Sequence, residues 1–195
     1  MKKKLLASLL VIGLVATSTQ IVEAKSTHTI KKGETLSTIS NQYAIPTAAI
    51  KRSNNLSSTN IVAGETLTIP TTVSSNEKEL LARLVHAEAK GEPYAGKVAV
   101  ATVVLNRVDS DLFPDNVNDV VYERSASGHY AFSPVLDGSI SNKADSESIR
   151  AVEEATQFRG QGQNSLYFYN PATATSKWVS TREQTLVIGD HVFAK

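Results

Sequence analysis

The chain has 195 residues, of which 41% are hydrophobic and 20% charged, with a formal net charge of +1 and no cysteine. These values are typical of a folded protein with one or two small domains. The lack of cysteine excludes a disulfide framework, a cysteine nucleophile and thiolate zinc sites, and the balanced charge gives no reason to expect nucleic-acid binding.

The first 24 residues have the pattern of a secretory signal peptide. Three lysines form a basic start, a short apolar run follows, and Val22-Glu23-Ala24 is a small-residue cleavage site. The apolar run is shorter than the ~20 residues that a membrane-spanning helix needs. Cleavage after Ala24 would leave 17 basic and 18 acidic residues. We therefore expect an exported protein without a transmembrane segment.

Residues 27–70 form a small module that the pattern predicts as strand, helix, helix, strand. Alternation around Ile30 is typical of a strand, and Thr35 begins a helix with apolar residues at every third or fourth position. Pro46 opens a second helix, where its missing N–H is not needed. Asn54 and Asn55 end that helix, since asparagine tolerates left-handed backbone geometry. A glycine turn and a closing strand complete the module, which contains no catalytic grouping.

This module resembles a LysM domain over nearly its whole length. The matching features are G-E-T-L at the first helix, Asn-Asn-Leu after the second, and the ending G-x-x-L-x-I-P. The resemblance implies binding to glycan that contains N-acetylglucosamine, chiefly peptidoglycan, in a groove between the first turn and the second helix. It carries over the groove positions Gly33, Thr35, Asn54 and Asn55. For Gly33, Asn54 and Asn55 we favour a backbone-forming role, in a groove that they shape.

Residues 71–79 are polar and read as a linker, and residues 80–195 are long enough to bury one core. We expect the larger segment to be mostly helical with a small, late β element, so that the whole chain is α+β. The expected helices cover residues 80–90, 94–108, 116–123 and 145–158, with 94–108 buried at the centre. A loop is expected over 124–141, and β-like segments over 165–170, 177–179 and 185–195, the last as a hairpin around Gly189-Asp190.

Glu88 is the main catalytic candidate of the larger segment. It follows Leu84 by four residues and Val85 by three, so it lies at the end of an apolar helical stripe. The ordinary interpretation is an ion pair or a cap, with Arg83 or Lys90 as partner. The functional interpretation is a catalytic acid. A helix C-terminus and an apolar pocket both raise the pKa of a carboxyl group, and glycan cleavage uses a neutral acid to protonate the leaving oxygen.

Four separated blocks between residues 80 and 195 resemble the cell-wall hydrolase family of the spore cortex-lytic enzymes. The blocks are ARLVHAEAKGEPYAGKVAVATVVLNRV, YAFSPVLDGSI, LYFYNPATATSKWV and IGDHVFAK. The resemblance implies a compact lysozyme-like domain related to lytic transglycosylases, with peptidoglycan, including spore cortex, as substrate. It also implies that Glu88 is the catalytic glutamate. His86 and Ala87 stand where Tyr-Gly is common in the family, and we expect this departure to alter packing rather than chemistry.

A single catalytic carboxyl favours a lytic transglycosylase. Ordinary glycosidases need two carboxylates at a set separation. Glu92 lies four residues from Glu88, but Gly91 and Pro93 indicate that the helix has ended, so Glu92 is expected to bond the backbone of its loop. Asp137 is most simply a turn residue. In a transglycosylase the 6-hydroxyl of muramic acid is the nucleophile, so that one glutamate can serve as acid and then as base.

Five further residues are candidates for substrate binding. Ser133 precedes a proline and is either a loop former or a hydrogen-bond partner of the substrate. Tyr167 and Tyr169 share a strand face, and we expect one of them to reach the cleft while Asn170 starts a turn. Trp178 either stacks on sugar or packs in the core. Asn106 and Arg107, in contrast, are expected only to cap the buried helix.

Other functional classes are less consistent with the sequence. A zinc amidase or peptidase would need histidine ligands, but His86 and Glu88 are ~200° apart on a helix and no H-E-x-x-H is present. A hydrolysing muramidase or glucosaminidase, and a non-catalytic wall-binding protein, remain as alternatives. We predict a secreted protein of the cell wall or spore that binds peptidoglycan without a metal or other cofactor. An accessory protein is left open.

Overall fold

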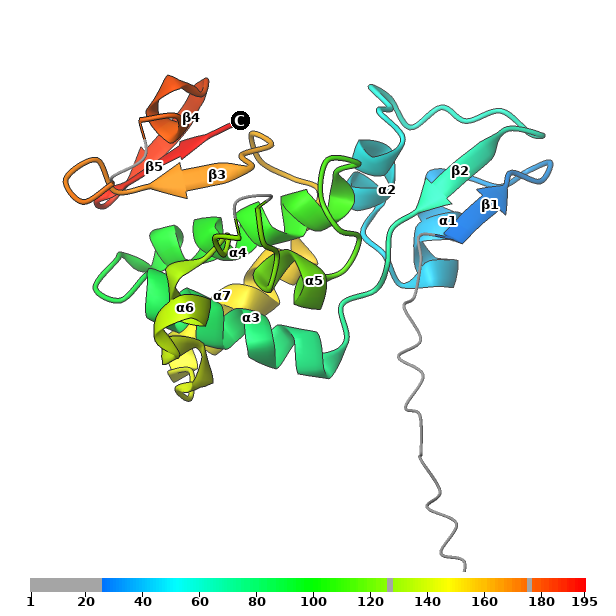
Figure 1. The fold of residues 1–195 in the computed structure, drawn as a ribbon. Helices are drawn as coiled ribbons and strands as arrows, with labels where there is room; N and C mark the ends of the chain where they lie inside the picture. Colours follow the sequence, from blue (N-terminus) through cyan, green and yellow to red (C-terminus); the bar gives the residue numbers. More distant parts are fainter. Residues whose placement is uncertain (1–25, 126–127, 175–176) are drawn as a thin grey trace, which may run out of the picture.

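The computed structural model describes residues 26–125, 128–174 and 177–195. Figure 1 shows a small N-terminal unit beside a larger helical unit, with a second small sheet along the helices. The predicted signal peptide, residues 1–24, lies outside the described residues. No helix in the described ranges combines the length and the apolar character that crossing a membrane requires.

The N-terminal unit has the predicted order of strand, helix, helix, strand. β1 (Ser26–Thr29) pairs antiparallel with β2 (Thr66–Ile69), and α1 (Leu36–Tyr43) and α2 (Thr47–Ser53) lie between them in the chain. Thr35 caps α1, as expected, because its side chain accepts the backbone N–H of Thr38. A small apolar core joins the sheet to both helices; it consists of Ile30, Leu36, Ile39, Ile45, Ala49, Ile50, Leu67 and Ile69.

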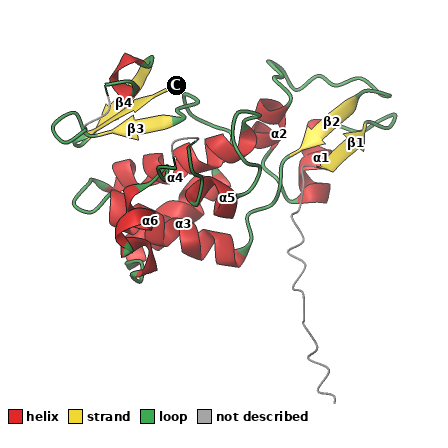
Figure 2. Cartoon of the chain, viewed as in Figure 1, coloured by secondary structure: helices red, strands yellow, loops and turns green. Residues whose placement is uncertain are grey.

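The larger unit is built around a central buried helix, as the sequence predicted. α4 (Tyr94–Asp109) packs against α3 (Ser75–Glu88), α5 (Val117–Val121) and α7 (Ser146–Gln157). Its middle residues Val100, Ala101, Val103 and Val104 have no exposed surface, since neighbours cover the helix on several sides. A mainly helical domain results (Figure 2).

The late β element is a three-stranded antiparallel sheet. β5 (His191–Ala194) lies between β3 (Tyr167–Tyr169) and β4 (Gln184–Ile188), and β4 and β5 form the predicted hairpin through Gly189-Asp190. Phe193 of β5 is fully buried in the helical core. The sheet is therefore attached to the helices through its central strand, and the α+β fold class is confirmed.

Three local predictions were wrong. α3 begins at Ser75, inside the segment 71–79 assigned to a linker, because Ser74 and Glu77 form a capping box whose polar turn carries no hydrophobic period. The predicted loop 124–141 contains α6 (Ser133–Asp137) and a 3₁₀ turn at Ser139–Ser141. Residues 177–179 are not a strand. They lead into a 3₁₀ turn at Val179–Thr181, outside the sheet.

The segment between the two units is held in place by a buried ion pair. Arg159, just after α7, bonds Asp109 at the end of α4 with an Nη2–Oδ1 distance of 2.6 Å, and neither side chain is more than 2% exposed. The same guanidinium donates to the carbonyl of Thr71 at 2.6 Å, and the Thr71 hydroxyl donates to the carbonyl of Asp115 at 2.7 Å. Three sequence-distant segments therefore meet here: Thr71, residues 109–115 and Arg159.

The N-terminal unit also contacts the helical unit directly. Arg52 of α2 donates to the side-chain oxygen of Asn106 on α4 and, at 3.1 Å, to the carbonyl of Gln161. Gly160 has a φ of +86° and lies against the start of α2, where a Cβ atom would be 2.1 Å from the backbone nitrogen of Ala49. Only a glycine allows this approach, so the two units are docked rather than loosely tethered.

A pair of glycine variants tests the docking. Gly160 and Gly162 both have positive φ, so alanine costs each about 1–2 kcal/mol of backbone strain, but a Cβ at Gly162 meets nothing within 4 Å. Gly160→Ala should therefore destabilise the chain well beyond Gly162→Ala and separate thermal unfolding into two transitions in calorimetry, one for each unit. Equal losses with a single transition in both variants would contradict the docked arrangement.

Candidate active site

Glu88 is the last residue of α3, and its side chain is half-buried. The residues before it, Leu84 and Val85, are fully buried in the core, which fixes the side of the helix from which Glu88 projects. Ser133, the first residue of α6, lies opposite, with its Oγ donating to Glu88 Oε1 at 3.4 Å. A carboxyl group is thus presented between a helix C-terminus and a short helix from a distant part of the chain.

The surroundings keep this carboxyl protonated to near-neutral pH. Burial is the main cause and raises the pKa of Glu88 to about 7, with a smaller contribution in the same direction from the negative charge of Asp137. The Ser133 hydrogen bonds and the positive charge of Arg107 oppose the shift but do not cancel it. Glu88 can therefore donate a proton at neutral pH and take one back, as a general acid and base must.

A cleft of about 530 Å³ is walled by aromatic residues and includes Arg107, whose charge acts on the Glu88 carboxyl group. Tyr167 and Trp178 meet edge to face with ring centroids 5.1 Å apart, and the Trp178 side chain is 53% exposed. Glu88 does not itself line the cleft; Ala131 does, two residues before Ser133. The segment that precedes α6 therefore lines the cleft at Ala131 and contacts Glu88 at Ser133. Aromatic faces of this kind are suited to sugar rings.

The cleft is supported by a buried cation that the sequence analysis did not identify. Arg107 had been expected only to cap its helix. It is 7% exposed, donates from Nε to the carbonyl of Leu166 at 2.7 Å, and has its guanidinium carbon 4.9 Å from the Phe113 ring centroid, 5.0 Å from that of Phe132 and 5.6 Å from that of Tyr167. No sequence pattern distinguishes such an arginine from a helix cap.

Glu123 is a second carboxylate that the sequence analysis missed. It lines the cleft, and its charge acts on Arg107, as that of Glu88 does. It follows α5 in a segment predicted as the end of a short helix, and nothing in its spacing relates it to Glu88. Arg107 thus lies within electrostatic reach of both carboxyl groups.

The remaining candidates of the larger unit fall into two groups. Both tyrosines line the cleft, Tyr167 and Tyr169, where only one was expected, and Trp178 joins them. Asn170 is in the turn after β3, where its Oδ1 accepts the N–H of Ala172 at 2.8 Å, and it does not line the cleft. Ser133 contacts Glu88 instead of standing alone in a loop.

Glu92 has the structural role that the sequence analysis expected. Its Oε2 accepts the backbone N–H of Asp190 at 3.1 Å and its Oε1 is 3.9 Å from His191 Nδ1. The carboxyl group, only 8% exposed, anchors the β4–β5 turn to the segment between α3 and α4.

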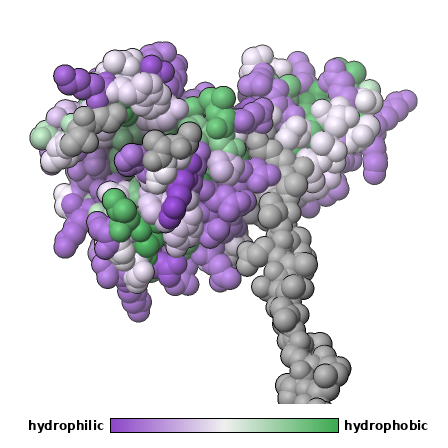
Figure 3. All heavy atoms as spheres, viewed as in Figure 1, coloured by the Kyte–Doolittle hydropathy of each residue, from purple (hydrophilic) through white to green (hydrophobic). Residues whose placement is uncertain are grey.

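The surface near Glu88 includes an apolar patch. Figure 3 shows this patch over α6 on a face that is otherwise mostly hydrophilic, and Leu136 of α6 is 76% exposed. Because Ser133 begins the same short helix, the patch lies next to the carboxyl group. A ligand with both polar and apolar faces would fit such a rim.

The four candidate residues of the small unit differ in exposure. Asn54 is used internally, since its amide accepts from the N–H of Thr68 at 2.7 Å and donates to two carbonyls. Thr35 caps α1, and Gly33 forms the turn before it with a φ of +89°. Asn55 has the expected left-handed φ, +53°, and an exposed side chain, whereas the same expectation was wrong for Asn54, whose φ is −116°. Among these four, Asn55 has the side chain most available to a ligand.

The histidines do not gather around a common point. Within the described ranges, no group of three or more His, Cys, Asp or Glu side chains could hold a metal ion. His86 has its Nδ1 3.2 Å from Asp145 Oδ2, and His28 has its Nε2 2.8 Å from Glu34 Oε2. His86 is therefore paired with the residue that caps α7.

Comparison with known proteins identifies the class of this chain. The family model described as Cell Wall Hydrolase matches residues 91–194, and the LysM domain model matches residues 28–70. The chain therefore belongs to the cell wall hydrolase family and carries a LysM domain. The family match begins three residues after Glu88, so the match itself does not include the candidate acid.

The more specific relatives are spore cortex-lytic enzymes. The chain is 44% identical over 127 residues to that of Oceanobacillus iheyensis and 41% identical over 127 residues to that of Bacillus subtilis, which is 65% of this chain and 44% and 40% of those proteins. The chain thus spans less than half the length of these curated relatives. The catalytic domain of the germination-specific lytic transglycosylase SleB from Bacillus anthracis is 42% identical, with a TM-score of 0.58, and matches over its whole length and 65% of this chain.

The raised pKa of Glu88 predicts a measurable effect on stability. The folded protein holds the proton up to about pH 7, whereas the unfolded chain releases it near 4.5, so wild-type stability falls as the pH rises through this window. Glu88→Gln removes this penalty. The variant should be more stable than wild type at pH 8 by on the order of 2–3 kcal/mol, and by progressively less as the pH approaches 4.5.

Denaturant unfolding at a series of pH values measures this difference. Glu153→Gln, on the exposed face of α7, controls for removal of one negative charge. If the Glu88→Gln difference is the same at pH 5 and pH 8, the carboxyl group does not have the raised pKa.

Proposed function

We propose that this protein cleaves the glycan strands of peptidoglycan as a lytic transglycosylase, with Glu88 as the only acid and base. The observation that carries the proposal is the half-buried Glu88 carboxyl, which has a pKa of about 7 and lies within reach of the charge of Arg107 in the aromatic cleft. The names of the relatives support the same class, since they are cortex-lytic and transglycosylase proteins. Because the chain spans less than half of the curated relatives, its substrate is part of the proposal.

The first step breaks the bond between the anomeric carbon of muramic acid and the oxygen of the next glucosamine. Protonated Glu88 gives its proton to that oxygen, which leaves with the bonding electron pair. The cleft residues Tyr167, Tyr169 and Trp178 hold the sugar rings by stacking, and Arg107 supports the aromatic wall from below.

The second step closes an intramolecular ring. The 6-hydroxyl oxygen of the same muramic acid bonds to the anomeric carbon and gives its proton to the Glu88 carboxylate. The product is 1,6-anhydromuramic acid, and the acid form of Glu88 is restored without a net gain or loss of protons. Ser133, within 3.4 Å of the carboxyl group, orients it and stabilises its charged form between the two steps.

A hydrolysing muramidase is the second candidate, and Glu123 favours it. This carboxylate lines the cleft and could activate water, which is the role that a second carboxylate has in an inverting glycosidase. We favour the transglycosylase because Glu123 provides the largest favourable charge interaction of the buried Arg107, which gives this carboxylate a structural role in the cleft.

The LysM unit supports a location in the cell wall or at the spore. Its predicted groove positions, Gly33, Thr35 and Asn55, are on the surface or in turns, so peptidoglycan could reach them while the unit stays docked. We propose that it holds the enzyme to insoluble peptidoglycan. The name "spore cortex-lytic enzyme" of the relatives favours the cortex of spores as the site of action.

Replacing the acid should abolish cleavage. Glu88→Gln keeps the shape of the side chain but has no transferable proton, so the rate of peptidoglycan lysis should fall at least 10³-fold, while binding to insoluble wall is kept. Turbidity loss and release of soluble fragments measure the rate. Glu92→Gln keeps the bond from the Asp190 N–H and should lose less than tenfold. An active, folded Glu88→Gln enzyme would refute the assignment.

The product ends distinguish the two candidate reactions. Intramolecular nucleophiles reach effective molarities of ~10⁵ M or more, so the 6-hydroxyl should outcompete water and most new ends should be 1,6-anhydromuramic acid. Borohydride reduction followed by mass spectrometry identifies them, because anhydro ends take up no hydride. Glu123→Gln should leave the product type unchanged. Reducible muramic acid ends that disappear in Glu123→Gln would establish the hydrolase instead.

A further inference from the structure

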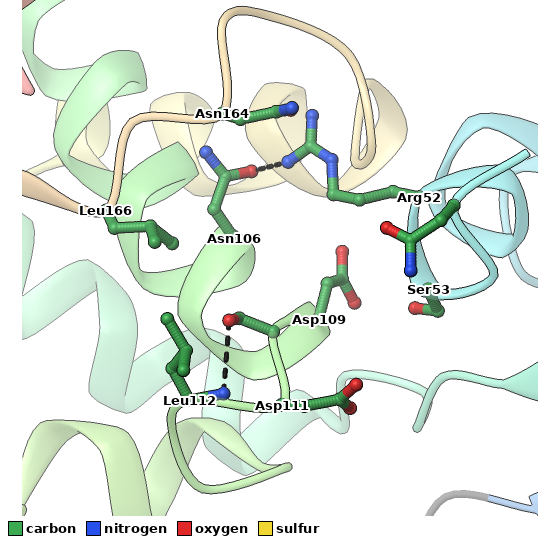
Figure 4. Close-up of a pocket in the computed structure, with 10 residues that line it drawn as sticks. Arg52, Ser53, Asn106, Asp109, Asp111, Leu112, Asn164 and Leu166 are labelled. Carbon is green, nitrogen blue, oxygen red and sulfur yellow. Dashed lines mark hydrogen bonds between the residues drawn. The ribbon is translucent and has the colours of Figure 1, made fainter. Parts of the chain in front are cut away.

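A second cavity lies where the LysM unit meets the catalytic unit. It has a volume of about 300 Å³ and is lined from one side by α2 and from the other by α4, the loop after α4 and the segment before β3 (Figure 4). Another cavity of about 300 Å³ adjoins it and shares Arg52, Asn55 and Asn164. Neither cavity includes Glu88 or any residue of the aromatic cleft.

The floor of this junction pocket is rigid. Asn106 accepts a hydrogen bond from Arg52 and donates another to the carbonyl of Ser165 at 2.9 Å, so its amide is fixed on both sides (Figure 4). Asp109 is fixed by Arg159, as described above. A pocket whose base is already bonded is preorganised and needs little reordering when a ligand enters.

The exposed rim, in contrast, offers unused groups. Asn164 has an exposed side chain whose amide makes no hydrogen bond to the described part of the chain, and its backbone has a φ of +61°, an unusual value for a residue other than glycine. Asn55 across the pocket has φ +53° and an exposed side chain. Leu112 is 76% exposed beside them. The rim thus combines two amides with an apolar surface.

The chemistry of the rim and floor fits a neutral saccharide. An amide both donates and accepts hydrogen bonds, which matches sugar hydroxyls and acetamido groups, and Leu112 can contact an apolar ring face or an acetyl methyl group. The charges at the pocket balance, since Arg52, Asp109 and Asp111 line it and Arg159 pairs with Asp109. A phosphate or another anion would find no net positive charge here.

The junction pocket is a direct neighbour of the aromatic cleft. The two cavities are lined by consecutive residues at three places: 106 and 107 on α4, 112 and 113 in the following loop, and 166 and 167 at β3. Neighbouring side chains point to different sides of a helix or strand, so this row of residue pairs forms a wall between the two cavities, and Leu112 marks its exposed edge. A glycan long enough to extend past that row would reach the pocket.

We propose that the junction pocket is a saccharide subsite that binds the glycan strand beyond the catalytic cleft, between the two units. This proposal rests on the proposed function, because it takes the cleft to hold the same strand. It assigns Asn164 and Leu112 to substrate binding and gives the docked LysM unit a part in forming the subsite.

A binding series with glycans of increasing length tests the subsite. The full-length protein with Glu88→Gln is titrated calorimetrically with peptide-free peptidoglycan glycans of two to eight sugars, so that binding is measured without cleavage. Affinity should rise at the length where the strand passes the cleft. Adding Asn164→Gly, which relieves the positive φ while removing the amide, or Leu112→Ser should weaken binding of the long glycans about tenfold and remove that rise. Gln163→Ala, an exposed neighbour outside both cavities, is the matched control and should keep the rise.

Each outcome decides the question. Unchanged affinities at every length in both pocket variants would overturn the subsite, as would an equal loss in Gln163→Ala. A loss seen only when stem peptides are attached to the glycan would assign the pocket to peptide and also overturn the proposal. Cleavage by the protein with Glu88 intact is measured in parallel. If it does not cleave peptidoglycan, the proposed function fails, whereas normal cleavage with a flat length series refutes the subsite alone.

Discussion

The ion pair between Arg159 and Asp109 holds together segments of this molecule that are far apart in the sequence. Asp109 ends the central helix α4, Arg159 follows α7, and the third partner, Thr71, is the entry to α3 and therefore to Glu88. The next residue, Gly160, lies against the LysM helix α2. Removing one partner of such a pair leaves an uncompensated buried charge and typically costs 3–5 kcal/mol. A neutral pair of similar volume could conserve stability, but it would lose the directional bonds that set these three segments relative to each other.

Two opposing effects act on the pKa of Glu88 in the candidate active site, and burial of the carboxyl group is the stronger one. The proposed acid Glu88 must stay protonated near neutral pH, yet the cation of Arg107 lies against the aromatic rings of the cleft, and a nearby cation lowers the pKa of a carboxyl group. Arg107 is embedded among three rings and bonded to a backbone carbonyl, so its charge is used locally. The desolvation of Glu88 outweighs the remaining attraction, and Asp137 assists from the other end of α6. The short helix α6 therefore has opposite effects at its two ends. The Ser133 hydroxyl stabilises the charged form of Glu88, and the Asp137 charge destabilises that form.

Local sequence patterns sufficed for features that depend on neighbours in the chain. The βααβ order, the buried α4 and the hairpin at Gly189 each follow from periodicity or turn chemistry within about 15 residues, and the position of Glu88 follows from the stripe of Leu84 and Val85. The start of α3 and the whole of α6 were missed because only the hydrophobic period was followed, although Ser74 and Glu77 have the spacing of a capping box. The first turn of α3 is polar, and α6 is shorter than two helical turns. Neither leaves a period in the sequence.

The same limit applies to the site. Arg107 and Glu123 belong to the cleft because α4, the loop after α5 and β3 converge in three dimensions, and no spacing along the chain encodes that convergence. Asn106 was expected to cap a helix, yet it connects the two units through Arg52. The tyrosines show the opposite case, because strand alternation placed Tyr167 and Tyr169 on one face and both line the cleft. Long-range docking, rather than local propensity, decided which polar residues acquired a role.

The docked LysM unit changes how attachment to the wall relates to cutting. With a flexible linker, the local concentration of substrate at the catalytic site would depend on linker length, and the enzyme could sample many bonds from one anchoring point. Here Thr71 is clamped and Gly160 touches α2, so the proposed binding groove and the Glu88 carboxyl group keep a fixed separation. Under the proposed function, an anchored molecule would reach only bonds at one offset from its anchor, and it would have to release the wall before each new cut. The distance between the anchoring point and each cut on the glycan strand would then be set by the fold.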